Sequence, residues 1–158
     1  MKDINTLFVD DEEFTLKALE RILRKESYAR YYAESGAEAM RIMADTPIHI
    51  LVTDIRMPEM DGMSLLRQVK EHYPDTVRLA LSAYSIIGQP PPRTSTGEIF
   101  RFITKPIDPN ELRQAINDAI DYYLLHKDRI ELVNALKEKN RKLQAALEYQ
   151  VQIEEQLR

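Results

Sequence analysis

The stretch IHILVTD, residues 48–54, is a nearly continuous run of apolar side chains that ends in a carboxylate. A strand of this composition offers no polar face to water, and it is typical of a parallel sheet that is covered on both sides. Over about the first 122 residues, similar strand-like runs alternate with segments whose apolar residues recur at helical spacing. This alternation predicts parallel strands joined by right-handed crossovers, and therefore an open, doubly wound α/β sheet.

The expected elements can be placed along the chain from these patterns. Strands are expected at residues 6–9, 28–33, 48–53, 77–83 and 99–104. A helix follows the first strand, and another is expected at residues 63–73. Capping boxes at residues 35–38 and 108–111 indicate where two further helices begin, the second with a proline at its first position.

Polar or charged residues stand at the ends of four expected strands. In open α/β sheets, binding sites form at the carboxyl ends of the strands. The residues at these ends are Asp10 and Asp11, Asp54, Ser82 and Lys105. Because each group ends a different strand, we expect their side chains to converge on one edge of the sheet.

The chemistry of this group of side chains is specific. Three converging carboxylates raise one another's pKa unless a cation lies between them. Ligands that are all oxygens favour a hard ion, with Mg²⁺ ahead of Ca²⁺ and Zn²⁺. A carboxylate beside such an ion can attack phosphorus and form an acyl phosphate, provided that other groups neutralise the phosphoryl oxygens. The ammonium of Lys105 and the hydroxyl of Ser82 are suitable groups at suitable strand ends.

Four motifs occur in order along the chain: FVDDEEF (8–14), LVTDIRMPEMDG (51–62), LSAY (81–84) and FITKPID (102–108). Together they resemble the receiver domain of two-component response regulators, over roughly residues 4–122. The resemblance implies a flavodoxin-like, five-stranded parallel sheet. It also implies that a sensor histidine kinase or a phosphotransfer protein phosphorylates Asp54 in a Mg²⁺-dependent reaction.

The resemblance assigns a role to each site residue. It implies a Mg²⁺ site formed by Asp10, Asp11, Asp54 and the main-chain carbonyl of Arg56, with Asp11 and Asp54 as direct ligands. Lys105 and Ser82 would contact the phosphoryl group on Asp54. Ser82 and Phe102 would form the hydroxyl–aromatic switch that reports phosphorylation. On this interpretation the domain is a signalling module and not an enzyme, although a longer protein could carry an enzymatic output domain.

Two other functions remain open. A phosphatase of the haloacid-dehalogenase type also uses an aspartyl nucleophile, but it places a second acid two residues later, where this chain has Arg56. Alternatively, the domain could be a degenerate receiver that takes no phosphate and acts as a dimerising scaffold. Labelling with a small phosphodonor distinguishes these functions from a working receiver.

The last part of the chain has a different character, which predicts a receiver domain at residues 1–122 and a helical extension at 123–158. The extension contains neither glycine nor proline, and a helix could run unbroken from Pro109 to near the end. Core positions of a heptad repeat extend from Val133 through Asn140 to Leu147, and the repeat then degrades at Gln150 and Glu154. We expect a parallel homodimer through this helix, with a solvated single helix as the alternative. Linkers of this kind resemble those that join receivers to output domains.

Residues 85–97, SIIGQPPPRTSTG, depart from the receiver pattern, which has its fourth helix here. Three consecutive prolines lack amide donors, and each interior proline costs a helix about 3 kcal/mol. We therefore expect no regular helix from Gly88 to Thr96. The sheet near Phe100 and Phe102 would then be partly uncovered, and the relay between Ser82 and Phe102 altered.

Composition excludes several classes of protein. The chain has no cysteine, which rules out disulfides and thiolate metal sites and fits a reducing cytoplasm. Its net charge is -4, with no basic stripe, so we expect no direct contact with nucleic acid. No apolar run approaches the roughly 18 residues of a membrane span, and acids occupy the place of a signal peptide's apolar stretch. We expect a cytoplasmic protein without membrane contact.

Overall fold

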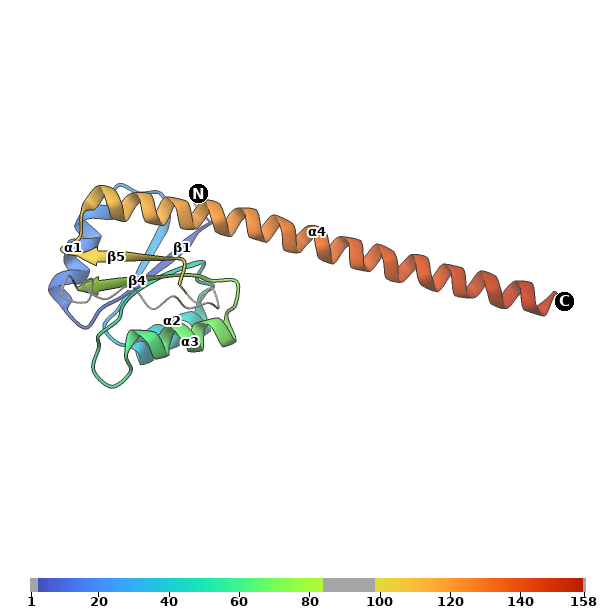
Figure 1. Cartoon of the computed structure of the whole chain (residues 1–158), viewed down its shortest axis with the longest axis horizontal. Coiled ribbons are helices and arrows are strands. Elements are labelled where there is room, and N and C mark those ends of the chain that lie inside the picture. The colour runs from blue at the N-terminus through green and yellow to red at the C-terminus, as the bar shows by residue number, and fades with distance from the viewer. Residues whose placement is uncertain (1–2, 84–98, 158) are drawn as a thin grey trace. The chain divides into compact units, whose positions relative to one another are not determined.

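A computed structural model describes residues 3–83 and 99–157 of the chain. Within this part, five strands form one parallel sheet in the order β2-β1-β3-β4-β5 (Figure 1). The strands are β1 (Asn5–Val9), β2 (Ala29–Ala33), β3 (Ile50–Asp54), β4 (Val77–Ala83) and β5 (Arg101–Lys105). The predicted five-stranded α/β sheet is confirmed, and the observed strands start within two residues of the expected positions.

Helices cover both faces of the sheet. They are α1 (Glu13–Leu23), α2 (Gly36–Asp45), α3 (Gly62–His72) and α4 (Pro109–Gln156). Buried residues of α1 and of the first turns of α4 pack on one face, and those of α2 and α3 pack on the other (Figure 1). This arrangement confirms the doubly wound fold.

The central strand β3 is buried along its whole length. Alternate residues of the strand enter opposite hydrophobic clusters: Ile50 and Val52 pack with α1 and α4, and Leu51 packs with α2 and α3. A strand with apolar side chains on both sides can be stable only under two layers of helices. The position of Asp54, at the end of this strand, therefore depends on the core.

The helix starts agree in part with the predicted capping boxes. The Ser35 hydroxyl accepts a hydrogen bond from the Glu38 amide at 3.1 Å, as expected. The Glu38 carboxylate, however, accepts from the amide of Glu34 at 3.0 Å and not from that of Ser35. At the start of α4, the Asp108 carboxylate accepts from the amide of Asn110 at 3.2 Å. The sequence thus identified these helix starts, but not every hydrogen-bond partner.

Contacts divide the chain into two compact units, residues 1–123 and 124–158. The first unit contains the sheet. In the second unit the chain is helical to Gln156, which confirms the long C-terminal helix, and Arg141 pairs with Glu138 at 2.7 Å. Among the described residues, no helix combines the length and the apolar character needed to cross a membrane. The prediction for residues 85–97 lies outside the described residues.

The cap of α2 leads to a prediction about stability. Replacing Ser35 with alanine removes the acceptor for the Glu38 amide and should lower the free energy of unfolding by about 1 kcal/mol. The matched control is Ser27→Ala, because Ser27 is an exposed serine outside the helices; its effect should stay within about 0.5 kcal/mol. Urea denaturation measures both, and equal losses would contradict the capping role.

Candidate functional site

The predicted strand-end residues lie at one edge of the sheet. Asp10 and Asp11 directly follow β1, Asp54 is the last residue of β3, and Lys105 is the last residue of β5. A pocket of about 280 Å³ opens there, and its lining includes Asp11, Asp54, Arg56 and Lys105. The parallel topology thus brings together residues that are far apart in the sequence.

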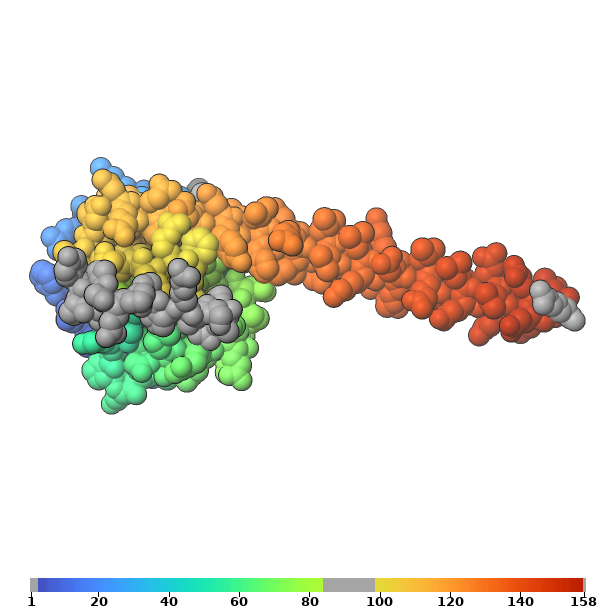
Figure 2. All heavy atoms as spheres, viewed as in Figure 1, coloured from blue at the N-terminus to red at the C-terminus, as the bar shows by residue number. Residues whose placement is uncertain are grey.

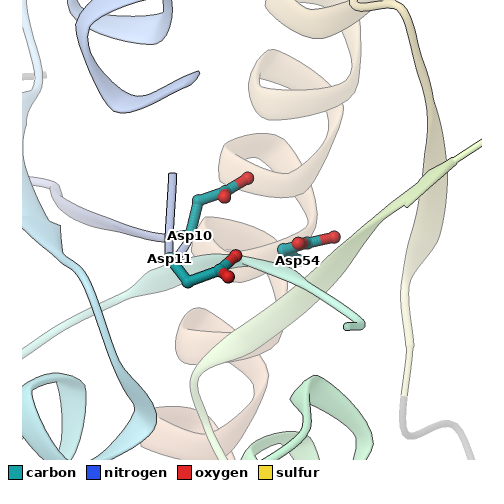
Figure 3. A group of neighbouring side chains, drawn as sticks. All are labelled: Asp10, Asp11 and Asp54. Atoms are coloured by element: carbon teal, nitrogen blue, oxygen red, sulfur yellow. The ribbon is translucent and has the colours of Figure 1, made fainter. Parts of the chain in front are cut away.

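Three carboxylates form the centre of this site. One oxygen from each of Asp10, Asp11 and Asp54 lies within 4.8 Å of the others, and Figure 3 shows the three side chains side by side. Asp10 is fully buried and Asp54 is 8% exposed, whereas Asp11 is exposed. The cluster therefore has a buried side and a side that is open to solvent.

Lys105 lies against the buried side of the cluster. Its ammonium donates to Asp10 Oδ2 at 2.9 Å and lies 3.5 Å from Asp54 Oδ1. The other oxygen of Asp10 accepts from the main-chain amide of Glu12 at 2.9 Å. Both oxygens of Asp10 are therefore engaged, whereas the carboxylate of Asp11 has no hydrogen bond to any side chain that the structure describes. This leaves Asp11 and Asp54 as the more available metal ligands.

Electrostatics within the site favour the arrival of a cation. Burial raises the pKa of Asp54, and the negative charges of Asp10 and Asp11 add to this effect against the opposing charge of Lys105. Burial alone would lower the pKa of Lys105, but its hydrogen bond and charge interaction with Asp10, together with Asp54, raise it. Lys105 thus stays protonated and still does not fully compensate the carboxylates.

The donor set fits Mg²⁺. All the candidate side-chain ligands are carboxylate oxygens, and the cluster contains neither histidine nor cysteine. Mg²⁺ prefers one or two carboxylates and keeps several waters, and a pocket open to solvent on the Asp11 side allows this. Asp11 and Asp54 would hold the ion, with Asp10 behind them.

Ser82 and Phe102 lie beside the site without joining its hydrogen bonds. Ser82 is buried, and its hydroxyl donates at 3.5 Å to the carbonyl of Ala83, the limit for such a bond. In the described part of the chain, it makes no hydrogen bond to Asp54. Phe102 is half-buried on β5 and packs in the cluster under α2 and α3. Neither residue lines the pocket, and among the described residues no hydrogen bond joins either side chain to the carboxylates or to Lys105.

Thr53 and Gly62 help to position Asp54, although neither residue was given a role from the sequence. The Thr53 hydroxyl donates to the carbonyl of Asp54 at 3.0 Å. Gly62 donates its amide to Ile55 at 2.7 Å, and a side chain at Gly62 would collide with the carbonyl of Asp54. The Asp61-Gly62 pair was the available signal: Asp61 caps α3 by accepting from the Ser64 amide at 2.7 Å.

Comparisons with known proteins agree with this geometry. Residues 6–117 match the family model for the response regulator receiver domain. The transcriptional regulatory protein GlrR of Escherichia coli K12 is 38% identical over 120 residues, which cover 76% of this chain and 27% of GlrR. The regulator NtrC of Proteus hauseri is 30% identical over 137 residues, 87% of this chain and 29% of that protein. The chain thus spans less than a third of these relatives.

Solved structures show the same fold. A response regulator receiver domain protein from Clostridium thermocellum superposes with a TM-score of 0.70 at 27% identity, covering 77% of this chain and 98% of the other. A structure described as an adenylate cyclase from Rhodopirellula baltica gives a TM-score of 0.76 at 30% identity, covering 82% and 96%.

Because α3 begins close to the end of β3, alanine substitutions at two helix-start glycines should differ in their effect on stability. Gly62→Ala places a methyl group against the main chain of Asp54 and Ile55, and overpacking of this kind costs about 1–3 kcal/mol. Gly36, at the same position of α2, would meet the Met60 side chain and no main-chain atom, and the closest contact would be to the flexible thioether. Gly36→Ala should change the free energy of unfolding by less than about 1 kcal/mol. Urea denaturation of both variants measures these changes. If Gly62→Ala left the free energy of unfolding unchanged, the contact between α3 and the end of β3 would not be tight.

The raised pKa of Asp54 predicts a pH-dependent gain in stability. A carboxyl whose pKa is raised by folding destabilises the fold when ionised, and has no such effect below the ordinary aspartate pKa. In a metal chelator, Asp54→Asn should therefore resist urea better than the parent at pH 7, and the difference should vanish below about pH 3.

The control for this experiment is Asp61→Asn. The Ser64 amide lowers the pKa of Asp61, so its ionised form stabilises the fold above the ordinary aspartate pKa. This variant should show no gain at pH 7. If Asp54→Asn proved less stable than the parent at pH 7, the ion pair with Lys105 would outweigh burial and repulsion.

Proposed function

Because the chain belongs to the family of response regulator receiver domains, we propose that Asp54 accepts a phosphoryl group from a sensor histidine kinase or phosphotransfer protein in a Mg²⁺-dependent reaction. The observation that carries this proposal is the position of Asp54, at the end of a buried strand, in an open pocket with two other carboxylates and 3.5 Å from an ammonium. The domain is a signalling module that assists only its own phosphorylation and dephosphorylation.

The reaction is a transfer between two protein side chains. A carboxylate oxygen of Asp54 attacks the phosphorus of a phosphohistidine, the P–N bond breaks, and the imidazole leaves with its electron pair and is then protonated. The product on this chain is an acyl phosphate. A bound Mg²⁺ would supply charge neutralisation for the phosphoryl oxygens.

Two side chains of this protein have roles in the transfer. The ammonium of Lys105 already lies between Asp10 and Asp54, so a small shift toward Asp54 would bring it to a phosphoryl oxygen. The Ser82 hydroxyl makes only a 3.5 Å bond, so turning it toward the phosphoryl group costs little. Phe102 would follow this movement as the aromatic member of the switch. The carbonyl of Arg56 would complete the metal ligands.

The second unit of the chain supports a role in relay. Apolar side chains of α4, among them Val133, Leu136 and Leu143, are about half exposed or more. A helix that exposes such residues is expected to bury them against another helix. We therefore propose that the chain forms a homodimer through this helix and passes the signal to an output domain or partner. The negative net charge argues against direct contact with nucleic acid, and the lack of cysteine fits the cytoplasm.

Labelling with a small phosphodonor tests the proposal. With acetyl phosphate and Mg²⁺, the intact protein should gain the mass of one phosphoryl group. The gain should be lost in Asp54→Asn and in excess chelator, and retained in Asp45→Asn, which changes an exposed aspartate at the end of α2. No gain in the parent protein would instead favour a degenerate receiver that acts as a scaffold.

A further inference from the structure

Five leucines of the second unit lie exposed along α4 at a regular interval. Leu125, Leu136 and Leu147 are eleven residues apart, and Leu132 and Leu143 repeat the same interval. Their side chains are 52% to 65% exposed. We call these five residues the leucine stripe. Within this unit the chain is a single helix to Gln156 (Figure 2).

An eleven-residue interval keeps side chains on one face of a helix. Eleven residues make three turns of about 3.67 residues each, close to the 3.6 residues of an ordinary α-helix. The leucine stripe is therefore nearly parallel to the helix axis, and from Leu125 to Leu147 it extends about 33 Å. An exposed apolar stripe of this length on a helix is expected to be an interaction surface.

The stripe explains where the heptad repeat fails. Continued toward the C-terminus, the heptad predicted from Val133 places Gln150 and Glu154 in the core. Continued toward the N-terminus, it places His126 in the core, and also Arg129, which both repeats contain. The heptad thus describes only the centre of the helix, where the two repeats share most of their positions.

The eleven-residue repeat continues in both directions with fewer interruptions. It includes Leu125 and Leu132 before the centre and reaches Val151 after it, and it ends at Glu154. The polar residues within it are Arg129 and Asn140, which are themselves eleven residues apart. The apolar positions of α4 therefore follow this repeat over a longer distance than they follow the heptad.

We propose that a second copy of this chain pairs with the leucine stripe in parallel and in register, through an eleven-residue repeat and not a heptad repeat. This inference rests on the homodimer proposed above and specifies its interface. The repeat has about 3.67 residues per turn, slightly more than the 3.6 of an α-helix. The two helices should therefore lie nearly straight or wind around each other with a slight right-handed twist, whereas a heptad repeat gives a left-handed coiled coil.

Asn140 argues for a second copy in parallel orientation. A polar residue in an apolar seam needs a hydrogen-bonding partner when it is buried. In a parallel, in-register pair, Asn140 faces itself, and each amide can donate to and accept from the other. An antiparallel pair centred on Leu136 would set Asn140 against Leu132, which offers no partner.

Charges at the N-terminal end of the stripe partly oppose this arrangement. Arg129 occupies the same position of the repeat as Asn140, so in the parallel pair it lies opposite Arg129 of the second copy. The adjacent Asp128 of each copy offsets part of this repulsion. The pairing is therefore expected to be weaker at Arg129 than at the leucines on either side of Asn140.

Two adjacent residues distinguish the repeats in the full chain. Leu132 belongs to the leucine stripe, whereas Val133 belongs to the heptad seam. Leu132→Gln should weaken self-association about tenfold or more, as expected for a buried interface leucine, and Val133→Gln less than about threefold. Sedimentation equilibrium measures both, and circular dichroism checks that helicity is kept. Equal losses, or a larger loss from Val133→Gln, would overturn the eleven-residue repeat and leave the dimer intact.

Single introduced cysteines can show whether the two helices pair in parallel, because the chain has no cysteine of its own. Under oxidation, Leu125→Cys and Leu147→Cys should each cross-link to themselves, and Ala145→Cys, on the opposite side of the helix, should not. A disulfide formed only when Leu125→Cys and Leu147→Cys are mixed would show antiparallel pairing and overturn the proposal. A monomeric parent protein would refute the homodimer as a whole. Labelling of Asp54 in the same variants reports separately on the receiver.

Discussion

The ammonium of Lys105 bridges Asp10 and Asp54, and much of the fold can be understood as the means of bringing these three groups together. Asp10 and Lys105 are 95 residues apart in the sequence, and β3 and β4 lie between their strands in the sheet. Carboxylates crowded at a buried edge repel one another, so the cluster requires a cation held at the same edge. Parallel strands under two helical layers satisfy this requirement, because all their carboxyl ends meet there.

The compensation by Lys105 is incomplete, and this has a chemical use. The ammonium contacts Asp10 more closely than Asp54, and the pKa of Asp54 remains raised. Of the two buried carboxylates, Asp54 is therefore the one less well compensated by the protein itself. A site that leaves one buried carboxylate under-compensated favours the binding of a divalent cation and the chemistry that follows it.

The sequence predicted the fold, and the convergence of Asp10, Asp11, Asp54 and Lys105, for identifiable physical reasons. Asp54 could be located because it directly follows an apolar run. A strand that is covered on both faces can accommodate a charged side chain only at its ends. Other features depend on tertiary distances that no pattern contains. Whether Lys105 reaches Asp10 or Asp54 is decided by less than 1 Å. The weak bond of Ser82, and the reach of Glu38 to Glu34, likewise follow from main-chain positions set by packing.

Charge at the site has a consequence for recognition by partners. With their side chains ionised, three carboxylates and one ammonium leave two negative charges uncompensated. A bound divalent cation would make the site neutral. Phosphorylation would then replace the single charge of the Asp54 carboxylate with about two charges on the acyl phosphate, so the site would gain only about one negative charge. A partner that distinguishes the phosphorylated from the unphosphorylated metal-bound site would therefore have to respond mainly to where the side chains lie, because the change in net charge is small.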